Sequence, residues 1–481
     1  MLPIFQGKQA GARACIEGYA GTGKTFLTAR LIAEAFVSIP GARGERNSWG
    51  RWDTPPTVLI CGPTHKACRQ IERALAAYGV EDVVAVTLHS ALGIRPRRIE
   101  DREVFEVDPR ARQLIDGSTR LVVVDEASMV GRDLARLLWG ELPEGASLVA
   151  IGDPAQLQPV GDPTRSPLFD QPIQVRLTEV VRHQGPVLSL ATATRELGIG
   201  RPRFVASASS SSAVISHEHF GQWRQAAIRC CRQAAQEGNI DGARVLAWTN
   251  GAVAKFNGDL HRILYGPSAP PYVVGQPVVS HSAITGPDGL PLVSSTCEME
   301  LLAVEPAAGA IDGDELLEVR EALLGKRRTK AGEKLPPWQW WNIEAQLSGE
   351  GRRIQFQVLD PEQQSDWSKA AKVIASLAKG EAFLHGKAAA RDLWGLYWAR
   401  KDRFGRINPV WALTIHKSQG STFDRVFLHP DLDRHHDQGE RNQLAYVGIT
   451  RAAKALHVIA DPPPPPTDQD PPAAVLAGGV A

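Results

Sequence analysis

The 481-residue sequence predicts an α/β protein in which parallel sheets are flanked by helices. Short β-rich runs alternate with helix-length segments from residue 11 to about 160, and a second pattern of this kind begins at residue 244. The runs of the first pattern are almost wholly apolar, which is typical of strands buried on both faces of a parallel sheet. A hydrophobic fraction of 43% with 22% charged residues is ordinary for a globular protein. At roughly 150 residues per domain, the length allows about three domains.

The first pattern predicts five strands in one α/β domain. In chain order the β-rich runs are RACIE, TVLIC, VVAVT, LVVVDE and SLVAIGD. A helix is expected from Lys24 to Phe36, and another after Thr64. The charged stretch between Gly93 and Asp108 has no helical apolar stripe, so it predicts a β-hairpin that projects from this domain.

The second half of the chain predicts an interrupted α/β domain. The run RVLAWTN starts its pattern, the run ALTIHKSQG resumes it, and the serine-rich stretch 207–212 is typical of a loop. Between the two runs, turn-forming residues and short β-like segments at regular spacing predict a small inserted β-barrel. The expected divisions are 1–183 for the first domain with its hairpin at about 93–110, 184–274 with 386–460 for the second domain, 275–385 for the barrel, and 461–481 for a disordered proline-rich tail.

Charge and cysteine content exclude several classes of protein. The 54 Lys and Arg residues nearly balance 53 Asp and Glu residues, so any nucleic-acid surface has to be local. Six scattered cysteines without a C-x-x-C pair favour neither a disulfide framework nor a zinc knuckle. The sequence has no signal-peptide pattern and no apolar run of about 18 residues, so we expect a soluble cytoplasmic protein that does not bind membranes.

The run GYAGTGKT predicts a binding site for the phosphates of a nucleotide. It matches G-x-x-x-x-G-K-[S/T] and stands between a predicted strand and a predicted helix, where backbone amides face a β-phosphate. The lysine reaches the β- and γ-phosphate oxygens, and the last threonine ligates Mg²⁺. A turn that served packing alone would not need this Lys-Thr pair. The residues expected to bind the nucleotide here are Gly18, Gly21, Thr22, Gly23, Lys24 and Thr25.

Two further strand ends supply the groups that phosphoryl transfer to water requires. Asp125 and Glu126 follow the buried run LVVV, and we expect Asp125 to hold Mg²⁺ while Glu126 polarises the attacking water. Gln156 follows the run SLVAIG and is placed to sense the γ-phosphate. A solvated strand end is the alternative for an isolated Asp-Glu pair, but the upstream phosphate loop favours a nucleotide hydrolase.

Taken together, these residues resemble the motifs of superfamily 1 helicases. Eight segments match those motifs in order, and they extend from about residue 10 to 460: GYAGTGKT, GPTHKA, TLHSALG, VVDEASM, GDPAQLQPV, LTEVVR, ALTIHKSQGSTFD and LAYVGITRA. THKA, TLHSALG and HKSQGSTFDRVF are most similar to the Dda- and RecD-like branch, as are the inserted hairpin and barrel. The resemblance implies two RecA-like domains and an ATP-dependent DNA helicase that uses ATP and Mg²⁺. It also implies 5′–3′ movement on single-stranded DNA and action at junctions of single- and double-stranded DNA, where a monomer can work.

The resemblance also assigns roles to individual residues. Arg182 and Arg451 would reach the γ-phosphate, Arg451 as an arginine finger from the second domain, and Gly420 would belong to the nucleotide site. The implied nucleic-acid contacts are Thr64, His65 and His89 on the first domain and Thr414, His416 and Ser418 on the second. Phe105 in the hairpin would stack on the last base pair of the duplex, although packing at the base of the hairpin is equally compatible with its position.

Several alternatives stay open at the level of sequence. The chain could be an RNA helicase, a helicase-like subunit of a nuclease complex, or a clamp that binds DNA under the control of ATP without moving. The segment 326–341, which contains Trp338, Trp340 and Trp341, has the composition of a base-stacking surface, but barrel-core tryptophans beside a basic loop are the favoured interpretation. The histidines near Asp431 favour a solvated loop over a metal site because their spacing is irregular.

Overall fold

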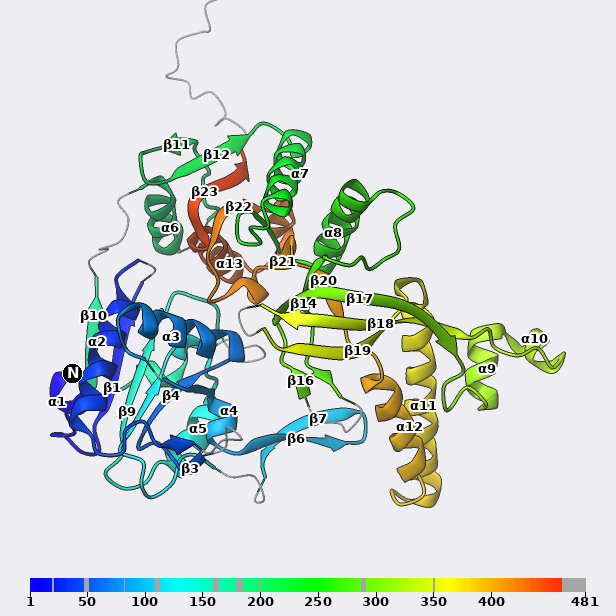
Figure 1. The fold of residues 1–481 in the computed structure, drawn as a ribbon, viewed down its shortest axis with the longest axis horizontal. Coiled ribbons are helices and arrows are strands. Elements are labelled where there is room, and N and C mark those ends of the chain that lie inside the picture. The colour runs from blue at the N-terminus through cyan, green and yellow to red at the C-terminus, as the bar shows by residue number, and fades with distance from the viewer. Residues whose placement is uncertain are drawn as a thin grey trace, which may run out of the picture.

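The computed structural model describes residues 1–19, 21–46, 52–81, 83–108, 113–158, 164–178, 185–198, 200–286, 291–348 and 351–460. Two α/β lobes lie at the left and top of Figure 1, and an antiparallel sheet with two long helices lies at the right. The proline-rich tail at 461–481 is outside the described residues. Within the described ranges, no helix is both long and apolar enough to cross a bilayer.

The first lobe is a six-stranded parallel sheet in the order β10-β1-β9-β8-β4-β5. All five predicted runs form strands of this sheet, and β10 is an additional edge strand that the sequence pattern did not indicate. The strands are β1 (Arg13–Gly18), β4 (Val58–Gly62), β5 (Ala85–Thr87), β8 (Leu121–Val124), β9 (Ser147–Gly152) and β10 (Ile173–Leu177). The helices are α1 (Leu2–Phe5), α2 (Lys24–Ser38), α3 (His65–Ala77), α4 (Leu88–Ala91) and α5 (Arg132–Glu141), with 3-10 turns η1 (Ala127–Met129) and η2 (Pro167–Phe169). A short ribbon is formed by β2 (Glu45–Arg46) and β3 (Trp52–Thr54).

Helices and turns cover both faces of this sheet, which explains the continuous apolar runs. Val123 enters the buried cluster that contains Ile32 of α2, whereas Val122 and Val124 enter the cluster on the opposite face with Phe169. Because successive side chains of a strand point to opposite faces, a strand covered on both sides must be apolar at every position. The carboxyl ends of these strands meet at one edge of the sheet, where the phosphate loop and the acidic pair follow β1 and β8.

The second lobe has a sheet in the order β11-β12-β23-β22-β13-β21, in which only β11 runs antiparallel to its neighbour. Its strands are β11 (Ser207–Ala208), β12 (Ala213–His217), β13 (Arg244–Ala247), β21 (Ala412–Thr414), β22 (Phe423–Leu428) and β23 (Ala452–Ile459). Its helices are α6 (Pro186–Glu196), α7 (Phe220–Gln236), α8 (Asn250–Tyr265) and α13 (Gln438–Thr450), with turns η4 (His416–Ser418) and η5 (Pro430–Arg434). The serine-rich stretch contributes β11 and is therefore more ordered than the expected loop.

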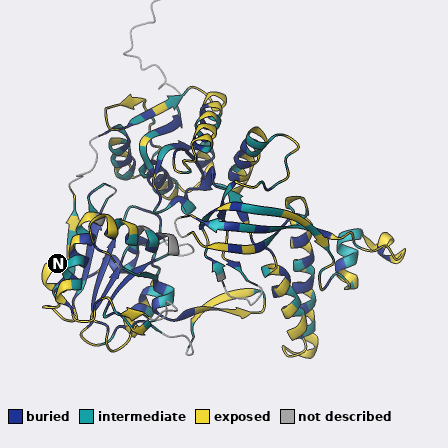
Figure 2. Ribbon diagram, in the orientation of Figure 1, coloured by how far each residue is buried: buried dark blue, intermediate teal, exposed yellow. Residues whose placement is uncertain are grey.

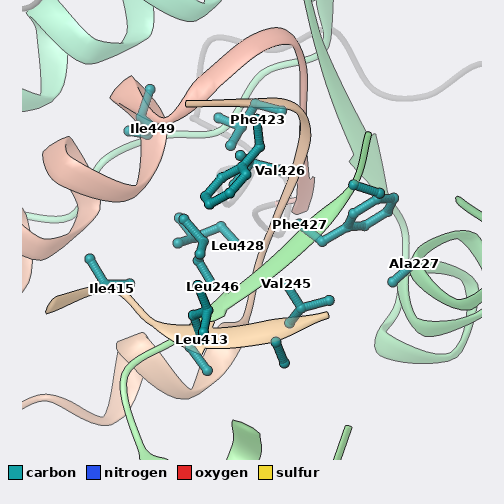
Figure 3. Close-up of a cluster of buried hydrophobic side chains, with 14 of the residues drawn as sticks. Ala227, Val245, Leu246, Leu413, Ile415, Phe423, Val426, Phe427, Leu428 and Ile449 are labelled. Carbon is teal, nitrogen blue, oxygen red and sulfur yellow. The ribbon is translucent and has the colours of Figure 1, made fainter. Parts of the chain in front are cut away.

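The core of the second lobe is built from strands that are distant in sequence. Val245 pairs with Phe427 and Leu246 pairs with Leu428 in the register of β13 and β22. In Figure 3 Phe427 points toward Ala227 of α7, while Leu246 and Leu428 lie on the other side of the sheet. This arrangement places the ends of β21 and β22 beside α13, which carries the last predicted site residue.

The inserted region is an antiparallel sheet in the order β19-β18-β17-β14-β20. The strands are β14 (Pro277–Ser280), β17 (Glu298–Gly309), β18 (Trp338–Leu347), β19 (Arg353–Leu359) and β20 (Ile407–Pro409), with a small pair β15 (Ile284–Thr285) and β16 (Pro291–Val293). The sheet curls, since the Gly405 amide donates to the Gln357 carbonyl at 2.8 Å and brings the approach to β20 onto β19. The closed barrel stays a prediction.

Helices that the turn-rich pattern did not predict occur in and after this insert. They are α9 (Leu317–Leu324), α10 (Lys326–Lys330), η3 (Pro361–Gln363), α11 (Gln364–His385) and α12 (Arg391–Asp402). In α11 the buried residues Trp367, Ala370, Ile374 and Ala378 recur at helical spacing, so a signal for this helix was present. The side-by-side helices α11 and α12 project from the sheet (Figure 1).

The charged stretch within the first lobe forms a two-stranded antiparallel ribbon of β6 (Ile94–Ile99) and β7 (Arg102–Val107). The ribbon reaches from the first lobe across to α11 and α12 in Figure 1, and Figure 2 shows that β7 is largely exposed. Glu100 at its tip has a φ of +55°, a left-handed conformation that is uncommon for residues other than glycine.

Candidate active site

The phosphate loop joins β1 to α2 at the carboxyl edge of the first sheet. Gly21 and Gly23 have φ values of +83° and +78°, which side chains with a Cβ rarely adopt. At Gly18 a Cβ would lie 2.6 Å from Thr22 Oγ1 and 2.9 Å from Lys24 Cγ, so only glycine fits there. Lys24 Nζ donates to the carbonyl oxygens of Gly18 at 2.5 Å and Tyr19 at 3.1 Å, which holds the ammonium over the loop.

The acidic pair stands at the end of β8, beside this loop. Burial and the neighbouring carboxylate of Glu126 raise the pKa of Asp125 to about 7, although Lys24 and a backbone amide act in the opposite direction. Glu126 has a φ of +50°, and such strained conformations concentrate at functional sites. Its Oε2 atom is buried without a hydrogen-bond partner among the described residues. The carboxylates are therefore poised for a ligand.

Asp153 and Gln156 follow β9 in a tight turn next to the acidic pair. Gln156 is only 3% exposed, and its Oε1 atom has no hydrogen-bond partner in the described part of the chain. The Gln156 amide donates to the Asp153 carbonyl at 3.2 Å, and the Ala155 amide donates to Asp153 Oδ1 at 3.0 Å. A buried amide oxygen and a buried carboxylate oxygen that both lack partners fit a bound nucleotide with its hydrated cation.

The residues present also fit Mg²⁺. Hard cations prefer carboxylate and hydroxyl oxygens, which Asp125 and Thr25 supply by residue type. Thr25 is the second residue of α2, but its side chain lies outside the described residues. A cation bound at this edge would also favour the ionised form of Asp125, opposing the raised pKa.

Arg451 brings the second lobe to the same site. It ends α13 and is 7% exposed, with its guanidinium donating to the carbonyl oxygens of Val447 and Ser421, both at 3.1 Å. Burial lowers the pKa of Arg451, whereas the nearby carboxylates of Glu126 and Asp153 raise it, so the guanidinium lies within electrostatic reach of the acidic pair.

Of the two other residues predicted for this site, the structure describes Gly420 but not Arg182. Gly420 has a φ of +74° and precedes Ser421, so it permits the turn that presents the Ser421 carbonyl to Arg451. Gly420 therefore lies beside Arg451, and its place in the nucleotide site stays a prediction. Arg182 lies outside the described residues.

Two contacts join the lobes at this site, and neither was predicted from the sequence. The Tyr446 hydroxyl of α13 donates to Asp153 Oδ2 at 2.6 Å, and the Arg195 guanidinium of α6 lies 3.6 Å from the ring centroid of Tyr19 in the phosphate loop. Asp153 and Tyr446 both fall inside segments that carry the helicase resemblance, so their importance had a signal in the sequence. Their pairing had none, because it depends on how the lobes face each other.

The predicted nucleic-acid residues of the first lobe have mixed placements. Thr64 caps α3, since its Oγ1 accepts the Ala67 amide at 3.2 Å, and the side chain of His65 lies outside the described residues. The rings of His89 and Phe105 meet edge to face with centroids 5.6 Å apart, and Phe105 is 56% exposed. The structure therefore brings the predicted wedge residue next to a predicted DNA contact.

The corresponding residues of the second lobe surround η4. His416 is half-buried, and burial, the largest effect, lowers its pKa. Thr414 is 8% exposed, and its Oγ1 accepts the Lys417 amide at 3.4 Å. Ser418 is fully buried and its hydroxyl donates to the Ile415 carbonyl at 2.7 Å, so the expectation of an outward contact from Ser418 is not met in this conformation. The tight 3-10 turn uses this hydroxyl internally.

Comparisons with known proteins identify the family of the chain. Residues 8–219 match the family described as AAA domain, and residues 409–459 match the UvrD-like helicase C-terminal domain. The ATP-dependent DNA helicase dda of Enterobacteria phage T4 is 26% identical over 463 residues, which cover 92% of this chain and 93% of that protein. The chain is a superfamily 1 helicase of the Dda- and RecD-like branch.

Another relative matches only part of the sequence, and a solved structure is similar at low sequence identity. The ATP-dependent RecD2 DNA helicase of Deinococcus radiodurans is 31% identical over 187 residues, covering 38% of this chain and 22% of that protein. A crystal structure of Bacteroides Pif1 bound to single-stranded DNA has 16% identity and a TM-score of 0.44, covering 93% of this chain and 88% of that one.

The ribbon tip of the helicase is fastened to α11 and α12. Lys379 Nζ of α11 lies 2.7 Å from Asp101 Oδ2, and the Trp398 indole of α12 donates to the Glu100 carbonyl at 2.8 Å. Arg98 pairs with Asp402 and lies 4.6 Å from the centroid of the Trp398 ring. The ribbon, the inserted sheet and α12 enclose a hollow of about 1290 Å³.

The tryptophan-rich segment contributes to a buried core, whereas the histidine-rich segment is less solvated than expected, since Asp431 and His435 are buried. Trp338 is 4% exposed and packs against Trp367 with ring centroids 4.9 Å apart, as the core interpretation predicted. Trp340 packs against the Phe404 ring at 5.9 Å. Asp431 accepts the backbone amides of Trp248 and Thr249 at 3.0 and 2.9 Å, so this carboxylate fixes the start of α8.

Proposed function

We propose that this helicase uses ATP hydrolysis to move 5′–3′ along single-stranded DNA and to separate duplex DNA at junctions. The observation that carries the proposal is the meeting of both lobes at one site, where the Tyr446 hydroxyl donates to Asp153 Oδ2 at 2.6 Å and Arg451 lies within electrostatic reach of Glu126. Similarity to a DNA helicase over 92% of the chain supports the same activity. Because the arginine finger and the acidic pair are on different lobes, the rate of hydrolysis can depend on closure of the lobes.

The proposed roles in hydrolysis are those that the motifs and the helicase resemblance imply. Lys24 binds the β- and γ-phosphate oxygens, Glu126 accepts a proton from the attacking water, and Gln156 orients groups at the γ-phosphate. Arg451, with Arg182, spreads the charge of the transferred phosphoryl group. Bound by Thr25 and Asp125, Mg²⁺ supplies charge neutralisation on the phosphate oxygens.

The proposed DNA track crosses both lobes. Thr64, His65 and His89 on the first lobe and Thr414 and His416 on the second grip the strand alternately as the cleft opens and closes. Phe105, exposed beside His89, stacks on the last base pair. The predicted division into two lobes with a hairpin and a barrel as inserts is part of this proposal, with the second insert extended beyond residue 385 because β20 belongs to the inserted sheet.

Unwinding by the isolated chain tests the proposal. Duplex DNA with a 5′ tail should be unwound in the presence of ATP and Mg²⁺, whereas a 3′-tailed duplex should not, and Lys24→Ala should abolish both unwinding and ATP turnover. Preference for RNA duplexes would indicate an RNA helicase. Failure to unwind alone, with activity restored by added nuclease subunits, would indicate a subunit of a nuclease complex.

Displacement of streptavidin from biotinylated single strands separates a motor from a clamp. A translocating helicase displaces streptavidin from the 3′ end during ATP hydrolysis. ATP-dependent binding without displacement would indicate the clamp and contradict the proposed movement.

A further inference from the structure

We infer that Tyr446 is a positioning residue that couples closure of the two lobes to the hydrolytic site through Asp153. The inference rests on the proposed ATP-driven function and adds to it a specific hydrogen bond between the lobes. The Tyr446 hydroxyl donates to Asp153 Oδ2 at 2.6 Å, and the two residues are 2% and 0% exposed. A water molecule therefore cannot replace this partner without opening the interface.

The carboxylate of Asp153 organises the turn that carries Gln156. Its Oδ1 atom accepts the Ala155 amide at 3.0 Å, while its main-chain carbonyl accepts the Gln156 amide at 3.2 Å. Rotation of the carboxylate to follow Tyr446 would disturb the first of these bonds. The position of Tyr446 is thus transmitted to Gln156, whose buried Oε1 atom has no partner among the described residues.

Tyr446 moves together with the arginine finger because both are on α13. Five positions separate Tyr446 from Arg451, which is about 7.5 Å along a helix. Arg451 Nε donates to the Val447 carbonyl at 3.1 Å, so the finger is also fastened to the turn that follows Tyr446. Arg451 ends this helix, and Tyr446 in the same helix contacts the turn that carries Gln156. A movement of the helix therefore displaces the arginine finger and the Gln156 turn together.

Simple packing between lobes does not account for this pair. Leu157 of the same turn enters the core of the second lobe, so apolar packing already joins the lobes without this pair. An apolar pair would serve such an interface without the cost of burying a carboxylate. A buried charge-assisted hydrogen bond instead specifies one orientation of the lobes.

The experiment compares Tyr446→Phe, Asp153→Asn and the double variant with the wild-type chain. Tyr446→Phe removes one oxygen and keeps the ring. We expect DNA-stimulated kcat to fall about 10- to 100-fold, the range that corresponds to loss of a charge-assisted hydrogen bond, while the Kd for ATP changes less than about twofold. The double variant should be no slower than the slower single variant, because both substitutions break the same bond.

Tyr265→Phe on α8 is the matched control, because it removes a hydroxyl from the second lobe away from the cleft. Its kcat should equal that of the wild-type chain. Thermal unfolding of every variant separates folding from coupling: a lower Tm with unchanged kcat below the transition would indicate a purely structural bond and overturn the inference. Wild-type kcat in Tyr446→Phe, or independent effects that multiply in the double variant, would overturn it as well. A wild-type chain without ATP turnover would instead contradict the proposed function itself.

Discussion

Release of the ribbon tip from α11 and α12 should slow duplex separation without affecting movement along single-stranded DNA. The perturbation is the triple variant Arg98→Ala, Asp101→Ala, Trp398→Phe. It removes the Lys379–Asp101 and Arg98–Asp402 ion pairs, the indole hydrogen bond to Glu100 and the stacking of Arg98 on Trp398. The phosphate loop and the acidic pair are untouched.

The magnitude follows from the exposure of these contacts. The side chains of Lys379 and Asp101 are 54% and 32% exposed, so this ion pair contributes about 0.2–1 kcal/mol, as does each similar pair. The indole hydrogen bond contributes about 0.5–1.5 kcal/mol and the stacked guanidinium about 0.5–1 kcal/mol. Together the contacts amount to about 1.4–4.5 kcal/mol, a docked-to-released ratio of roughly 10 to 2,000. Asp101→Ala alone should therefore leave the ribbon docked, whereas the triple variant should release it.

The assay measures unwinding of a 5′-tailed duplex and ATP turnover on single-stranded DNA. In the triple variant we expect unwinding to fall at least about tenfold and turnover to stay within about twofold of wild type. The matched control is Arg97→Ala, Glu106→Ala, Trp394→Phe, which changes the same charges and ring type without reaching the ribbon tip.

Amide hydrogen exchange over residues 94–107 checks that the ribbon is released. Faster exchange with unwinding equal to that of the control would refute the reasoning. Equal losses of unwinding and single-strand turnover would also refute it, because the ribbon would then not act separately from the motor.

Other substitutions test the site and its electrostatics. Glu126→Gln should bind ATP normally but hydrolyse it about 10² to 10⁴ times more slowly, and wild-type turnover in this variant would exclude Glu126 as the base. Because the folded chain raises the pKa of Asp125 to about 7, ionising this carboxyl costs stability as pH rises from about 4 through 7. Asp125→Asn should accordingly raise Tm in EDTA at pH 8 more than at pH 6, while abolishing Mg²⁺-dependent turnover. Burial, His217 and Arg425 lower the pKa of His457 to about 4, so protonation opposes folding as pH falls from about 6.5 to 4. His457→Gln should flatten the fall of Tm over this range, and parallel Tm profiles for the variant and wild type would contradict that assignment.

Much of the fold was predictable because the local pattern of apolar residues indicates which segments are buried. The five apolar runs of the first lobe are strands because helices cover both faces of the sheet, and a strand in that setting needs no alternation. Strand β10 escaped prediction because its alternating edge pattern, partly exposed at Ile173–Leu177, is weak in so short a segment. Helix α11 had a periodic apolar signal, but the turn-rich surroundings favoured a barrel in that interval.

The sequence by itself determined where the predicted triphosphate-binding residues lie relative to one another. Gly18 ends β1, Lys24 begins the next helix and Asp125 follows β8, and the carboxyl ends of these parallel strands meet at one sheet edge, so the proximity of the three residues is implied by chain order and strand direction. Only the tertiary structure decided that Tyr446 contacts Asp153 and that the ribbon tip docks on Trp398. The physical reason is that these contacts join segments up to 298 residues apart, and their geometry depends on how separately formed lobes and inserts pack, which no local periodicity records.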